Sequence, residues 1–203
     1  MIYLFHSTNN YYLRRTIKQQ KTVENIMVYN ERDVRHEHVI ECAKQMMTAA
    51  RTAPKAKGVD IIEVMMITDD DIVALSNALH QIGENMGRGG LMRDADNILS
   101  SDAVVLIGTR EEPMMLNCAY CGFTTCGERP EGVPCAMNTI DVGIAVGSAV
   151  ATAADLRLDT RVMYSVGYAA GKLGWMPGCK YIIGIPVSAG SKNPFFDRKR
   201  KVQ

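Results

Sequence analysis

The sequence predicts a layered fold of mixed secondary structure, an α/β or α+β sandwich, and two observations support this prediction. Short apolar runs rich in branched side chains, typical of buried strands, alternate along the chain with longer segments in which apolar residues recur every three or four positions, typical of helices. In addition, 203 residues, of which 47% are hydrophobic, suffice for one domain with a sizeable core. The sequence contains no internal repeat and no low-complexity segment.

The first half of the chain predicts three helices and one strand. Between Val34 and Ala53 the apolar residues follow helical spacing, and Pro54 ends that helix. The run Ile61–Ile67 predicts a largely buried strand. An acidic TDDD segment then predicts the capped start of a second helix, which continues to Met86 until a GRGG stretch breaks it. A shorter helix is expected from Met92 to Leu99.

The second half predicts three more strands and one long helix. Ala103–Thr109 predicts a buried strand, and the segments VMYSVG at 162–167 and YIIGIPVS at 181–188 predict two others around a short glycine-rich stretch. The helix from about Cys135 to Leu156 is apolar nearly all round and contains small residues, so we expect it in the centre of the fold or in a subunit interface. Aspartates and glycines interrupt its apolar stretch, so no membrane span is predicted.

The charge balance disfavours a mainly electrostatic binding function. The chain has 23 basic and 22 acidic residues and a formal charge of +1, so we expect no binding to nucleic acid or to an anionic membrane surface. Six cysteines are too few for a disulfide scaffold in a chain of this length. These features together lead us to expect a cytoplasmic protein.

The first 26 residues stand apart from the predicted domain. Their apolar run is only four residues long, and no cleavage site of small residues follows, so the segment fails as a signal peptide. Two interpretations of residues 1–26 stay open: an extension upstream of a real start at Met27, or an arm that is disordered or lies along a partner subunit. Residues 27–203 are expected to form a single domain.

Four of the six cysteines fall within a loop at 117–135. The segment NCAYCGFTTCGERPEGVPC places Cys118, Cys121, Cys126 and Cys135 at the spacing C-x2-C-x4-C-x8-C, among glycines and prolines that are typical of turns. Such a loop has little hydrophobic burial to hold its shape. A metal centre bound by four thiolates would supply the missing order, because its binding free energy becomes folding free energy. We therefore predict that these four cysteines are metal ligands.

The identity of the metal stays open, because both zinc and iron–sulfur clusters accept four cysteine ligands. Only Cys118 and Cys121 form the C-x2-C knuckle that is common in zinc sites, and the wider gaps that follow favour a larger [4Fe-4S] cluster. Cys135 follows Pro134 at the expected start of the long helix, where free amides and the helix dipole would stabilise an anionic cluster. Zinc is the alternative, and the third hypothesis is that the cysteines are redox-active or structural thiols.

Several segments resemble known proteins. The string C-x-x-C-G-x-x-x-C resembles the four-cysteine domain of iron–sulfur subunits in bacterial electron-transport complexes and corrinoid proteins, which hold a [4Fe-4S] cluster, although the fourth cysteine comes earlier here. Most of the chain also resembles a family of bacterial and archaeal proteins described as containing a ferredoxin domain. The segments behind this second resemblance are AARTAPKAKG at 49–58, the cysteine loop, IDVGIAVGSAV at 140–150 and GKLGWMPGCKYIIGIPVS at 171–188.

The stretch AARTAPKAKGVDIIEVMMITD is similar to the part of nitroreductases in which a helix ends in A-A-R-x-A-P before a strand. This resemblance implies a nitroreductase-like α+β sandwich with the cysteine loop inserted before a long central helix, a homodimer, and FMN at the subunit interface. The usual flavin contacts are mostly missing. Lys55, Lys57 and Gly58, with Arg198 from the tail, are the residues that would hold an FMN phosphate, and solvated surface residues are the alternative.

The sequence assigns no catalytic residue. His36 and His38 are expected at the surface, Asp69–Asp71 is explained by helix capping, and Asp141 is read either as a buried carboxylate near the metal or, preferably, as favourable to the helix dipole. The leading hypothesis is a protein with one iron–sulfur cluster that transfers electrons to a flavin or an unknown redox partner, with oxidoreductase activity if FMN binds. The rival is a non-enzymatic zinc protein that serves as an interaction module.

Overall fold

The computed structural model describes residues 28–196, and its contacts divide the chain into two units, Met1–Val34 and Arg35–Gln203. In the first unit, the side-chain oxygen of Asn30 accepts a hydrogen bond from the backbone N–H of Arg32 at 3.1 Å. This contact is typical of an asparagine that precedes a helix. The two interpretations of the N-terminal segment concern residues outside the described part of the chain.

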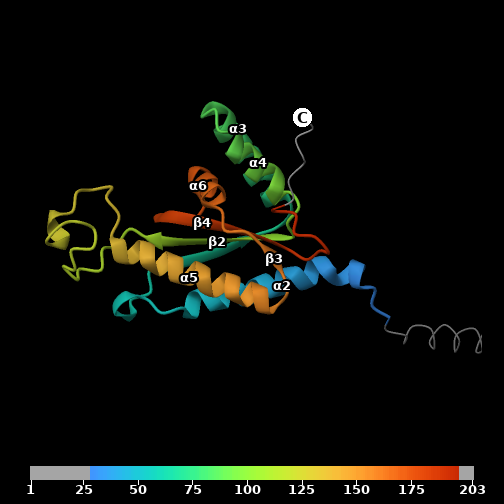
Figure 1. Cartoon of the computed structure of the whole chain (residues 1–203), viewed down its shortest axis with the longest axis horizontal. Coiled ribbons are helices and arrows are strands. Elements are labelled where there is room, and N and C mark those ends of the chain that lie inside the picture. Colours follow the sequence, from blue (N-terminus) through green and yellow to red (C-terminus); the bar gives the residue numbers. More distant parts are fainter. Residues whose placement is uncertain (1–27, 197–203) are drawn as a thin grey trace, which may run out of the picture. The chain divides into compact units, whose positions relative to one another are not determined.

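The second unit consists of a sheet between two layers of helices (Figure 1). The sheet is open, its strands follow the order β1-β2-β4-β3, and every neighbouring pair is antiparallel. In chain order the elements are α2 Glu31–Thr52, η1 Ala56–Gly58, β1 Ile62–Ile67, α3 Asp69–Asn85, α4 Gly89–Ile98, β2 Ala103–Arg110, η2 Cys126–Glu128, α5 Ala136–Asp155, β3 Asp159–Thr160, α6 Tyr164–Lys172 and β4 Cys179–Ser188. The predicted α+β sandwich is confirmed.

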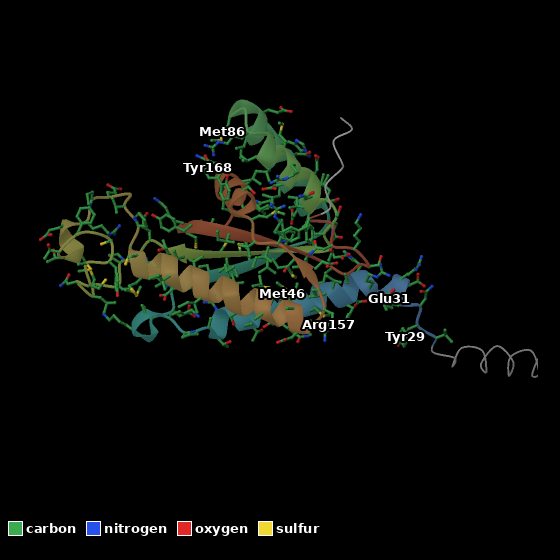
Figure 2. All side chains as sticks on the ribbon, in the orientation of Figure 1. Tyr29, Glu31, Met46, Met86, Arg157 and Tyr168 are labelled. Atoms are coloured by element: carbon green, nitrogen blue, oxygen red, sulfur yellow. The ribbon has the colours of Figure 1, made fainter. Side chains whose placement is uncertain are left out.

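Helices α2 and α5 cover one face of the sheet. Met46 of α2 lies in this layer, fully buried (Figure 2). A hydrogen bond joins the two helices, because the Ser148 hydroxyl of α5 donates to the Ala49 carbonyl of α2 at 2.9 Å. The core of this layer also contains Val39, Ala43, Ala50, Val142, Ala145, Val146, Ala149, Ala153, Ile107 and Ile185.

Helices α3, α4 and α6 cover the other face (Figure 1). Two glycines allow α6 to approach β4 closely: a Cβ on Gly167 would lie 1.8 Å from the Ile182 carbonyl oxygen, and one on Gly184 would lie 2.3 Å from a Val166 methyl. Real Cβ atoms do not approach other atoms so closely, so any larger residue would force the helix and the strand apart.

The structure corrects two predictions about individual elements. The segment at 162–167 is not a strand: Met163 makes a single antiparallel bridge to Gly184, and α6 begins at the next residue. A run of six residues is too short for its period to separate strand from helix. The third helix begins at Gly89 rather than Met92, so the GRGG stretch both ends α3 and starts α4.

The long helix α5 is apolar enough to cross a membrane by length and composition alone. Its buried residues pack on the sheet. Its opposite face is exposed and remains apolar, with Ile140 and Ile144 at 47% and 39% exposure. The buried face of α5 therefore confirms the predicted central position. The alternative position, in a subunit interface, concerns the exposed face.

Candidate functional site

The cysteine loop lies in the connection between the end of β2 and the start of α5, at one end of the sheet (Figure 1). Three residues of this connection other than glycine adopt a left-handed backbone: Met115, Asn117 and Ala119, with φ of 50°, 50° and 61°. Such residues each cost on the order of 1 kcal/mol and persist where the surroundings over-determine them. The strain is therefore concentrated around the first of the four predicted ligands, Cys118.

The four predicted ligands differ in their exposure. Cys118 is exposed, Cys121 and Cys126 are half-buried and Cys135 is buried, and all of them are free thiols. Among residues 28–196, no three histidine, cysteine, aspartate or glutamate side chains are arranged so that they could hold a metal ion. The assignment of the four cysteines as ligands stays a prediction.

Cys126 is tied to the residue that precedes the first cysteine. The backbone N–H of Asn117 donates to the Cys126 sulfur at 3.4 Å, and the backbone N–H of Cys126 donates to the Asn117 side-chain oxygen at 2.8 Å. Two reciprocal bonds thus connect the segment of Cys118 to η2. Sequence reasoning missed Asn117, and its position beside a predicted ligand is the one signal that could have pointed to it.

Cys135 occupies the N-cap position of α5, and its side chain makes no capping hydrogen bond there. Burial alone would raise the pKa of Cys135. However, the nearby backbone N–H groups of Met114, Asn138 and Met137, together with the positive charge of Arg129, hold this pKa below the ordinary thiol value. The site therefore favours the thiolate, which is the form that binds a metal.

Two polar atoms near Cys135 are buried without a hydrogen-bond partner in the described residues: Arg129 Nε and Asn138 Oδ1. The Asn138 amide nitrogen donates to the Glu112 carbonyl at 2.9 Å, which fixes the side chain between the loop and α5. An unpaired guanidinium N–H fits an anionic group. Four thiols in one loop and a donor without a partner are compatible with an anionic iron–sulfur cluster.

The segment between α2 and β1 meets the base of the cysteine loop. Ile61, Met114 and Cys135 form a small buried cluster, against which Ala56 packs. The Lys57 ammonium donates to the Met114 carbonyl at 3.2 Å. The structure therefore brings together two segments that the sequence treats as separate candidate sites.

The residues predicted to hold an FMN phosphate have other partners. The Lys55 ammonium side chain is 5% exposed and donates to the carbonyls at the end of α2, those of Ala50, Arg51 and Ala53. Lys57 binds Met114, and Gly58 has a φ of +67° with open space around it. Arg198 lies outside the described residues.

Lys55 therefore fits a helix C-cap better than a phosphate ligand, because a lysine at a helix C-terminus satisfies carbonyls that lack partners in the helix. The described lysines do not fit a flavin phosphate site, and binding of FMN stays a prediction.

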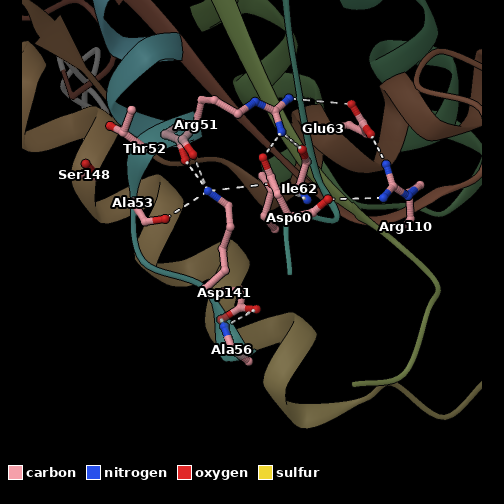
Figure 3. Close-up of polar contacts among 12 residues, drawn as sticks. Arg51, Thr52, Ala53, Ala56, Asp60, Ile62, Glu63, Arg110, Asp141 and Ser148 are labelled. Atoms are coloured by element: carbon pink, nitrogen blue, oxygen red, sulfur yellow. Dashed lines mark hydrogen bonds and ion pairs between the residues drawn. The ribbon is translucent and has the colours of Figure 1, made fainter. Parts of the chain in front are cut away.

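Asp141 is a buried carboxylate, 2% exposed, rather than a residue that only faces the helix dipole. Both of its oxygens accept the backbone N–H of Ala56 at 3.1 Å. Burial raises the pKa of Asp141 above its ordinary value, against the opposing effects of the Ala56 N–H and the Lys55 charge. Asp141 thus anchors η1 to α5 (Figure 3).

A chain of ion pairs connects the end of α2 to strands β1 and β2 (Figure 3). Sequence reasoning missed these ion pairs. Arg51 pairs with Asp60 at 2.8 Å and with Glu63 at 3.7 Å, and Arg110 pairs with Glu63 at 2.6 Å. Burial alone would raise the pKa of Asp60, but Arg51 and Lys55 lower it below the usual value. These side chains are about 40% exposed and form ion pairs with one another. We therefore assign them a structural role.

The two histidines near the start of α2 have structural partners. The two ring nitrogens of His36 approach Asp102 at 2.9 Å and Asp69 at 3.3 Å, whereas His38 approaches the buried Cys42 sulfur at 3.5 Å. The hydrogen bond to Asp102, with the nearby charge of Asp69, raises the pKa of His36 despite the opposing effect of burial. The predicted surface position of His36 is correct.

Comparison with known structures identifies the class of fold. A protein described as "the oxidoreductase containing FMN" is 16% identical, with a TM-score of 0.52 over 75% of this chain and 67% of that chain. A nitroreductase family protein from Clostridium novyi NT is 14% identical, with a TM-score of 0.49 over 73% of each chain. The first of these two likenesses shows that the chain shares the fold of that oxidoreductase, in agreement with the predicted α+β sandwich.

Comparison of sequences identifies the family. A protein of Archaeoglobus fulgidus, described as "Uncharacterized protein", is 40% identical over an alignment of 185 residues, and the alignment covers 86% of this chain and 100% of that relative. Residues 131–198 match the family described as "Uncharacterized protein containing a ferredoxin domain (DUF2148)". The chain belongs to this ferredoxin-domain family, and the expected family resemblance is confirmed.

Proposed function

We propose that this protein is an iron–sulfur redox protein that holds one [4Fe-4S] cluster through Cys118, Cys121, Cys126 and Cys135 and transfers electrons. The observation that carries the proposal is the position of Cys135, which is buried at the N-cap of α5 beside the positive charge of Arg129 and has a pKa below the ordinary thiol value. A structural thiol in an apolar core would have a raised pKa instead. Membership of a ferredoxin-domain family and the oxidoreductase-like fold support a redox role.

The chain's own residues would contribute in distinct ways. Cys135 is the ligand whose position is fixed by the fold, because it is the N-cap of α5. Asn117 holds the backbone of Cys126, and Arg129 supplies positive charge beside the thiolates. When bound, the cluster would accept and donate one electron, and N–H groups that face the sulfurs would favour its reduced form.

Exposed apolar residues on α5 support a homodimer. Ile140, Gly143, Ile144, Gly147 and Ala151 follow one another at helical spacing on the face turned away from the sheet. A continuous apolar stripe of this kind is more typical of an interface than of free surface. We propose that a second copy of the chain covers it, and that the dimer works in the cytoplasm with a separate redox partner.

Metal and chromophore analysis after anaerobic purification tests the cluster. We expect broad visible absorption, with about four iron and about four sulfide per chain. A colourless protein with about one zinc per chain would instead establish the structural zinc alternative. The same sample tests the flavin: a yellow chromophore released on denaturation would show that FMN binds.

A further inference from the structure

Arg129 lies in the segment between the third and fourth predicted ligands, Cys126 and Cys135. Its backbone N–H donates to the Cys126 carbonyl at 3.4 Å, directly after η2. Its guanidinium donates through Nη1 to the carbonyl of Val133, two residues before Cys135. Arg129 therefore joins the two ends of the segment that separates these ligands.

The Nε–H group of Arg129 has no hydrogen-bond partner among the described residues, although this atom is buried. A buried donor without an acceptor is costly, above all on a charged group, so such donors in native proteins commonly serve a bound ion or ligand. The hydrogen bond to Val133 fixes the other side of the guanidinium. The direction of the Nε–H group is therefore set by the loop.

Arg129 is the one basic residue of the cysteine loop, whose acidic residues are Glu128 and Glu131. A cluster bound by four thiolates is anionic and becomes more negative on reduction. Because charge in a low-dielectric site needs a nearby opposite charge, some group must offset it. Within this loop, only Arg129 carries the required sign.

We propose that Arg129 binds the inorganic centre directly, by donating its Nε–H to a sulfur of that centre while its Nη1 group holds Val133. The identity of the centre as an iron–sulfur cluster rests on the proposed function, whereas the same contact forms with any metal that the four thiolates bind. A hydrogen bond to sulfur and a nearby positive charge both stabilise negative charge, so Arg129 favours the reduced cluster.

Three variants separate the hydrogen bond from the charge. Arg129→Lys keeps the positive charge but places a methylene where the Nε–H stands, and Arg129→Met removes both. Lys180→Met is the matched control, because it also removes one positive charge. The Lys180 ammonium makes an exposed ion pair with Glu111 at 2.8 Å, outside the segment 117–135.

The first readout is hydrogen exchange of the Arg129 Nε–H, measured by NMR on the metal-free and the zinc-loaded protein. Zinc is the probe because it is diamagnetic and accepts four thiolates. Exchange should slow by about tenfold to hundredfold when zinc binds, the effect of one charge-assisted hydrogen bond. The Arg93 Nε–H, which donates to Asp94 at 3.3 Å on α4, is the internal reference and should not change.

Unchanged exchange at Arg129 in the zinc-loaded protein, or equal slowing at Arg93, would overturn the proposal. Failure of the protein to bind zinc would overturn both the ligand assignment and this proposal.

The second readout is the reduction potential of the anaerobically loaded protein. Arg129→Lys should have a lower potential than the wild type, Arg129→Met the lowest, and Lys180→Met a potential close to the wild type. Equal potentials in Arg129→Lys and the wild type, or an equal decrease in Arg129→Met and Lys180→Met, would contradict the hydrogen bond. If the wild type holds no cluster, the proposed function fails, and exchange in the zinc-loaded protein still decides the role of Arg129.

Discussion

At the residue scale, Lys55 and Lys57 both bind backbone carbonyls near the base of the cysteine loop. Met114 and Lys57 are 57 residues apart in the sequence and meet only because η1 packs on the start of the cysteine loop. The capping role of Lys55 could not be predicted from the sequence, because it depends on how the side chain turns back onto the end of α2. Contacts of this kind follow from the fold and carry no local sequence signal.

The cysteine assignment makes a prediction at the same scale. Replacing Cys126 by serine should remove most of the visible absorption and make the loop more sensitive to limited proteolysis, because a ligand and its ordering effect are lost. The control is Cys42→Ser, since Cys42 is buried within α2 and far from the loop in sequence. Equal bleaching in both variants would contradict the assignment of ligands.

His36 predicts a pH dependence of stability. Its pKa is raised by Asp102 and Asp69, so its contribution is complete below the ordinary pKa of about 6.5 and is lost as the pH rises through the higher pKa of the folded state. His36→Gln should therefore lower the free energy of unfolding more at about pH 6 than at about pH 9.

Chemical denaturation of both proteins across this range measures the difference. If the two unfolding free energies differed by a constant amount at every pH, the ion pairs of His36 would contribute nothing to stability.

At the element scale, most helices and strands followed from apolar periodicity, whereas the segment at 162–167 did not. Its branched and aromatic residues favour a strand, but Gly167 allows the backbone to come against the Ile182 carbonyl as a helix. Tertiary packing outweighed local preference there. The antiparallel order of the sheet was likewise not predictable, because helices between strands also occur in parallel sheets.

The close contact of α6 with β4 predicts a large effect of a small substitution. Gly167→Ala should lower the free energy of unfolding by about 3 kcal/mol or more, because its Cβ would overlap the Ile182 carbonyl. Gly171→Ala on the same helix is the control. Its Cβ would lie 3.5 Å from an Ile182 methyl, so it should be neutral or stabilising by up to about 1 kcal/mol.

Urea denaturation compares the two variants with the wild type. Similar midpoints for Gly167→Ala and Gly171→Ala would show that α6 can move away from β4 at little cost.

At the scale of the whole molecule, the exposed stripe of α5 predicts the state of assembly. Ile144→Glu places a charge in the proposed interface and should convert a dimer into a monomer, as measured by light scattering after size-exclusion chromatography. Val73→Glu is the control, because Val73 is a similarly exposed apolar residue on α3, which covers the other face of the sheet. A monomeric wild type, or loss of the dimer in both variants, would argue against this interface.

At the cysteine loop, we propose that four thiolates bind one inorganic cluster. X-ray absorption at the iron and zinc edges of the anaerobically purified protein tests this proposal, because it reports both the ligands and the neighbouring metals. We expect iron surrounded by sulfur, with further iron atoms as near neighbours. Zinc with sulfur ligands and no neighbouring metal, or no bound metal at all, would refute the cluster.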